Sequence, residues 1–143
     1  MKAHFVGNPR PIGIGRYVWK TSDVTKFVSA DGKEFVMPED FIYDGCTAPW
    51  LVRWAFPPDD GLYGRAVALH DYLVRFRYKL GLSLGDCHGY FAEALRVCGV
   101  GSERAKAMYL AVYMFNWTIA PKGDGSLPSG LMKRVKLIDL RPA

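Results

Sequence analysis

The hydrophobic period of the chain changes once, close to Pro49, and this change constrains the fold more than any other feature of the 143 residues. Before Pro49, apolar and polar residues alternate in short runs, which is typical of β-strands. After Pro49, apolar residues recur three and four positions apart, which is typical of helices that bury one face. A block of strands followed by a block of helices predicts an α+β fold.

The strand block, at about residues 3–45, is expected to form a small antiparallel β-sheet. Its runs "RYVWK", "VTKFVSA" and "KEFVMP" are rich in β-branched and aromatic residues. The Asp31-Gly32 pair between two of these runs predicts a hairpin turn. We expect Pro38 to end the third strand and "FIYDG" to follow as a short extended piece. The glycines and prolines of residues 9–15 predict irregular structure there.

The helical block, at about residues 49–120, is expected to form a cluster of three main helices. "WLVRWAF" adds one or two turns directly after Pro49. The first main helix is predicted from Tyr63 to Gly81 by a stripe of Leu69, Leu73, Phe76 and Leu80. The second is expected to start near Ser83 and to turn these side chains inward: Cys87, Phe91, Leu95 and Cys98. The third begins at Ser102, and a tail of undefined structure occupies residues 121–143 of this single domain, 1–143.

The third predicted helix is apolar on nearly every side over residues 107–120. A helix of this kind is normally packed on several faces. It is therefore expected either to form the centre of the helical cluster or to be covered by another protein chain. The run is shorter than the ~20 apolar residues that cross a bilayer, so no transmembrane segment is predicted.

Charge and cysteine content exclude some classes of protein. The net charge of +5 comes from cations scattered along the chain, which favours a solvated basic surface over a nucleic-acid-binding patch. Cys87 and Cys98 fall roughly 16 Å apart along one helix, too far for a disulfide. Reduced thiols, and an N-terminus without a signal peptide, predict a soluble intracellular protein.

His70 and Asp71 stand side by side at the rim of the apolar stripe of the first main helix. Burial of such groups costs several kcal/mol unless each finds a partner. One interpretation is catalytic: Asp86 orients His70 as a general base, while Asp71 helps to hold a hard cation such as Ca²⁺. Another is a transition-metal site, for example for Zn²⁺, built from His70, Asp71 and Asp86 with His88 or Asp44.

The structural alternatives stay open beside these. His70 can be a core histidine whose ring nitrogens are hydrogen-bonded. Asp86 stands three residues after Ser83, so the two can form a capping box at the start of the second main helix. Cys46 in "FIYDGCTAPW" is a conceivable nucleophile for His70, although a buried, inert cysteine is the favoured interpretation.

Four segments occur in an order that resembles a known family: "FIYDGCTAPW", "GRAVALHDYLVR", "GDCHGYFAEALRVCGV" and "RAKAMYLAVYMFNW". They resemble the phage-borne domain-of-unknown-function family numbered 1353, over about residues 35–117. The resemblance implies a tailed-phage or prophage origin. It also implies synthesis in the host cytoplasm and a possible place in the virion.

A second resemblance concerns the site. Secreted and parvoviral phospholipases A2 have a His-Asp pair on one helix, a calcium loop upstream and an Asp on the next helix. By this resemblance His70 would activate water, Asp71 would bind calcium and Asp86 would orient His70. The loop at Asp44 would stand where the calcium loop stands.

Two function classes follow from these patterns. The first is a small hydrolase that cleaves an ester or amide during cell entry or lysis. The second is a non-catalytic virion component of the tail, neck or baseplate, in which the same residues form a buried polar network. In that class, helix 107–120 would contact other virion proteins or a second copy of the chain.

Overall fold

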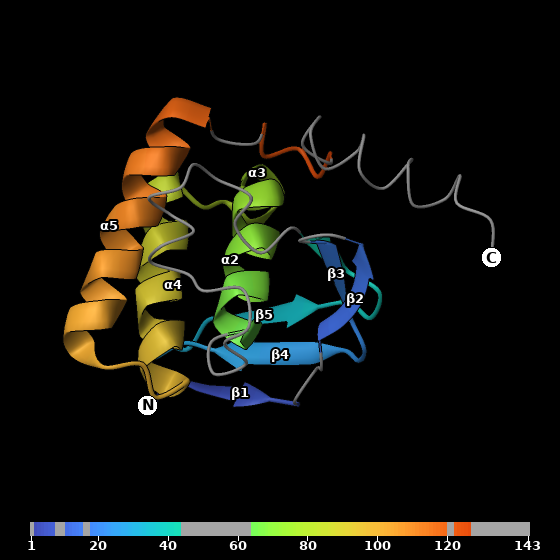
Figure 1. The fold of residues 1–143 in the computed structure, drawn as a ribbon, viewed down its shortest axis with the longest axis horizontal. Coiled ribbons are helices and arrows are strands. Elements are labelled where there is room, and N and C mark those ends of the chain that lie inside the picture. Colours follow the sequence, from blue (N-terminus) through green and yellow to red (C-terminus); the bar gives the residue numbers. More distant parts are fainter. Residues whose placement is uncertain (1, 8–10, 16–17, 44–63, 120–121, 127–143) are drawn as a thin grey trace.

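The computed structural model describes residues 2–7, 11–15, 18–43, 64–119 and 122–126. Strands occupy the N-terminal part and helices the C-terminal part, so the predicted α+β class is confirmed (Figure 1). The short helix expected after Pro49 lies outside the described residues.

The strands form two small antiparallel sheets where one was expected. The first sheet has the order β1-β4-β5, with strands His4–Val6, Thr25–Val28 and Glu34–Met37. The second has the order β2-β3-β6, with strands Pro11–Gly15, Val18–Thr21 and Ile42–Tyr43. Strand β5 ends directly before Pro38 and β6 continues the chain, as predicted.

The expectation of irregular structure at residues 9–15 was wrong for Pro11–Gly15, which forms β2. Pairing with β3 supplies the tertiary context that outweighs the weak strand preference of glycine and proline. The register shifts between Gly13 and Gly15, so the strand keeps a bulge or irregularity at its glycines.

The predicted hairpin at Asp31-Gly32 is confirmed. Strands β4 and β5 pair antiparallel, and the turn is closed by the Ser29 and Lys33 backbones. Gly32 has φ +87°, a conformation that side chains with a Cβ rarely adopt. The turn is held against the helices, because Tyr90 donates a hydrogen bond of 2.7 Å to Asp31.

The helical layer consists of α2 (Gly64–Arg75), α3 (Arg77–Leu80), α4 (Leu84–Val97) and α5 (Ser102–Ile119). Helix α4 lies between α2 and α5 (Figure 1). The second sheet contacts α2 through β6, and the first sheet contacts α4 through β1. The predicted start near Ser83 and the predicted end at Gly81 are confirmed.

The first main helix is interrupted at Phe76, where one continuous helix was expected. The cause lies far along the chain, in the turn at residues 122–126. The Gly125 N–H donates to the Arg75 carbonyl at 2.8 Å, and the Tyr78 N–H donates to the Gly123 carbonyl at 3.3 Å. These bonds satisfy backbone groups that a continuous helix would pair internally. We call residues 122–126 the glycine strap.

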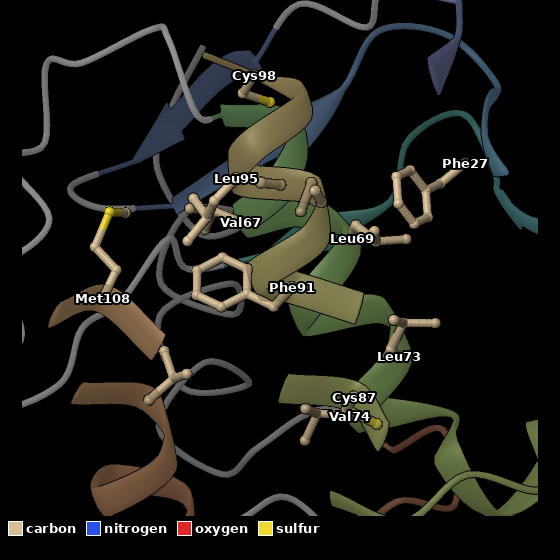
Figure 2. Close-up of a cluster of buried hydrophobic side chains, with 14 of the residues drawn as sticks. Phe27, Val67, Leu69, Leu73, Val74, Cys87, Phe91, Leu95, Cys98 and Met108 are labelled. Carbon is tan, nitrogen blue, oxygen red and sulfur yellow. The ribbon is translucent and has the colours of Figure 1, made fainter. Parts of the chain in front are cut away.

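The core lies where α4 meets α2 and the first sheet. The predicted inward set is buried: Cys87, Phe91 and Leu95 on α4, and Cys98 at its C-cap. Figure 2 shows Phe91 and Leu95 among side chains from α2, α5 and β4. Cys87 and Cys98 are both free thiols, as their predicted separation required.

Helix α5 is at the outside of the helical layer, so the expectation that it forms the centre of the cluster was wrong (Figure 1). Its inner face packs on α4 through Ala105, Met108 and Val112. Its outer face leaves Leu110, Tyr113 and Met114 exposed. The first sheet does not reach this outer face, because the first sheet packs on the other side of α4.

Candidate functional site

The centre of the candidate site is a contact between His70 of α2 and His88 of α4. Nε2 of His70 lies 2.9 Å from Nδ1 of His88, so one of these nitrogens carries the proton and the other accepts it. The two residues are brought together because α2 and α4 pack face to face over their apolar stripes. The pair therefore joins the two helices by a polar contact inside an otherwise apolar interface.

Aromatic side chains surround the histidine pair. The ring of Phe91 lies 4.7 Å from the ring of His70, measured between centroids. On the other side, Tyr109 and Tyr113 of α5 present their rings to His88 at 6.4 and 5.7 Å, in edge-to-face arrangements. The two tyrosines also stack on each other. Three helices thus contribute to the surroundings of the pair.

Burial keeps both histidines neutral. His70 is 6% exposed and His88 is 2% exposed. Removal from water lowers the pKa of His70 to about 3, with a further contribution from His88, and lowers the pKa of His88 to about 4. Desolvation disfavours the charged imidazolium, which explains the direction of both shifts. Near neutral pH the pair therefore consists of two neutral rings joined by one N–H···N hydrogen bond.

Asp86 belongs to the start of α4. Its side chain accepts a hydrogen bond from the Ser83 backbone N–H at 3.0 Å, while the Ser83 hydroxyl accepts one from the Asp86 N–H at 3.0 Å. This is the reciprocal capping box that the spacing allowed. The Asp86 carboxylate is exposed, and these bonds lower its pKa. The described partner of His70 is His88, and the expected His70–Asp86 dyad is replaced by this pair.

Asp71 acts electrostatically on the second sheet. Its charge contributes, after burial, to the raised pKa of Tyr43, the last residue of β6. Arg75, one turn further along α2, donates a hydrogen bond of 2.9 Å to the Ile42 carbonyl and lies over the Phe41 ring. This end of β6 is therefore fixed to α2, directly before the sequence position of Asp44.

The remaining candidate residues differ in what can be said of them. Asp44 and Cys46 lie outside the described residues. Within the described parts of the chain, no group of three or more His, Cys, Asp or Glu side chains is arranged to hold a metal ion. The facing nitrogens of His70 and His88 are bonded to each other, so they do not fit a shared metal ion without separation of the rings. The proposed Ca²⁺ or Zn²⁺ stays a prediction.

Sequence reasoning named both histidines but did not pair them. His88 was predicted only as a metal ligand, and helix 107–120 was predicted only to pack in the cluster or to contact another chain. The signal that could have found the pair is helical phase: His88, Phe91 and Leu95 recur at spacings of three and four, so His88 falls on the buried stripe of α4. A buried polar residue on one helix requires a partner on its neighbour.

Comparisons with known proteins place this arrangement in a family. A curated relative, "Uncharacterized protein y4jT" of Sinorhizobium fredii (strain NBRC 101917 / NGR234), is 29% identical over 120 residues. The match covers 80% of this chain but 32% of the relative, so the chain spans about a third of that relative's length. No solved structure matches the chain.

Among the described residues, the helices are too short or too polar to span a bilayer.

A family model matches residues 19–112, a stretch that runs from β3 into α5 and includes the histidine pair. Since this is more than half of the chain, the protein belongs to the family described as "Protein of unknown function (DUF1353)".

Proposed function

We propose that this protein is a non-catalytic component of a bacteriophage virion, in the tail, neck or baseplate. The observation that carries the proposal is the enclosed pair of His70 and His88. A general base must reach the proton that it removes from a substrate. His70 is buried, its Nε2 is engaged with His88, and the carboxylate expected to orient it caps α4.

The pair has a structural use that fits this function. It supplies the polar partner that each buried ring requires and so fixes one arrangement of α2 against α4. Virion components keep their shape while they contact neighbours, and a rigid helical layer suits that task. The exposed apolar side chains of α5, at Leu110, Tyr113 and Met114, are the surface that we assign to such contacts.

The phage origin in this proposal is supported by the order of the four family segments along the chain. The protein would be made in the host cytoplasm and then incorporated into particles. The test is mass spectrometry of purified particles released from a host that carries the gene. We expect the protein in the particles at a fixed ratio to the major capsid protein. Its absence from washed particles would overturn the virion assignment.

The non-catalytic assignment has a separate test on the purified protein. We expect His70→Asn to lower the melting temperature, because a buried partner of His88 is lost. We expect His4→Asn, at an exposed histidine of β1, to melt like wild type. A His70→Asn protein that melts like wild type would show that the pair is not structural.

The second candidate function is the small hydrolase with a metal site, for ester or amide cleavage in cell entry or lysis. The observation that favours it is the attachment of β6 to α2 directly before the sequence position of Asp44: Arg75 donates a hydrogen bond of 2.9 Å to the Ile42 carbonyl, and the charge of Asp71 acts on Tyr43. Asp71 and Asp44 would hold Ca²⁺ through oxygen ligands, or Zn²⁺ together with His88, and the metal would polarise the substrate carbonyl.

Elemental analysis and melting curves distinguish the two candidates. A divalent cation that binds only the native state stabilises it by an amount that grows with the logarithm of the free cation concentration above the Kd. The hydrolase candidate requires stoichiometric metal, or a rise in melting temperature on addition of Ca²⁺ or Zn²⁺ that is lost in Asp71→Asn. The virion candidate requires neither.

A further inference from the structure

We draw no further inference here: the strongest candidate, the exposed apolar face of α5 at Leu110, Tyr113 and Met114, carries none because nothing in the structure shows what covers it.

Discussion

Nε2 of His70 lies 2.9 Å from Nδ1 of His88, and this contact joins α2 to α4 within the helical layer. Most contacts around the pair are apolar and do not depend on direction. The hydrogen bond does, so it fixes which residue of α2 faces which residue of α4. The stability of the protein should depend on the two histidines jointly.

The first prediction is therefore a double-mutant cycle. His70→Asn and His88→Asn should each lower the free energy of unfolding by roughly 1–3 kcal/mol, because each leaves a buried ring without its partner. The double variant should lose less than the sum, with a coupling energy of about 0.5–3 kcal/mol. Urea unfolding measures all four proteins. Strictly additive losses would mean that the rings do not interact.

The second prediction concerns acid. Burial lowers the pKa of both histidines, to about 3 for His70 and about 4 for His88, whereas unfolded histidine has a pKa of about 6.5. Below pH 6.5 the unfolded chain therefore binds protons that the native state does not. Stability should be constant with respect to these groups above pH 6.5 and should fall between pH 6.5 and about 4, by up to about 1.4 kcal/mol per pH unit for each histidine.

Urea unfolding at several pH values between 4.5 and 7.5 measures this dependence. The His70→Asn/His88→Asn double variant should have a shallower acid slope than wild type, since the groups that take up protons on unfolding are gone. His4→Asn should keep the wild-type slope. An unchanged slope in the double variant would contradict the assignment of the acid dependence to the pair.

The third prediction separates Asp86 from catalysis. Asp86→Ala removes half of the capping box and should cost about 1 kcal/mol, as should Ser83→Ala. Together they should cost less than the sum, because they interrupt one reciprocal arrangement. Asp23→Ala, at an exposed carboxylate outside the helices, should change stability by less than about 0.5 kcal/mol. Chemical denaturation measures each variant, and no loss in Asp86→Ala would rule out the cap.

The fourth prediction compares two glycines with positive φ. Gly125 has φ +93°, and a Cβ there would lie 2.8 Å from the Phe76 ring. Gly32 has φ +87° and open space around the same position. In both Ala variants the backbone is strained by the positive φ. Only in Gly125→Ala must the new Cβ also displace the Phe76 ring. Gly125→Ala should therefore have a lower melting temperature than Gly32→Ala, with a free energy of unfolding lower by roughly 1–3 kcal/mol. Equal melting temperatures would show that the strap is not packed on Phe76.

Local rules predicted the elements that local chemistry controls. The Asp31-Gly32 turn, the end of β5 before Pro38 and the start of α4 after Ser83 each depend on a few neighbouring residues. Helical period likewise predicted the buried face of α4. These features could be predicted because nothing distant competes with them.

Features that depend on distant partners were missed. The strand at Pro11–Gly15 exists through pairing with β3, and the interruption at Phe76 exists through the glycine strap. The contact between His70 and His88 was missed for the same reason. His70 was matched with a carboxylate because such pairs are common in catalysis. Spacing indicates that His88 is buried on α4, but the residue of α2 that it meets depends on how the two helices pack.

The glycine strap also bears on the order in which the chain acquires its structure during synthesis. The Arg75 carbonyl is paired with the Gly125 N–H, which leaves the ribosome long after α2 itself. Until then the Arg75 carbonyl and the Tyr78 N–H lack their partners in the strap. Residues 64–80 can then form one continuous helix through Phe76. A nascent chain stalled before the strap should therefore carry a longer first helix than a chain that includes the strap, and emergence of residues 122–126 would convert one form into the other.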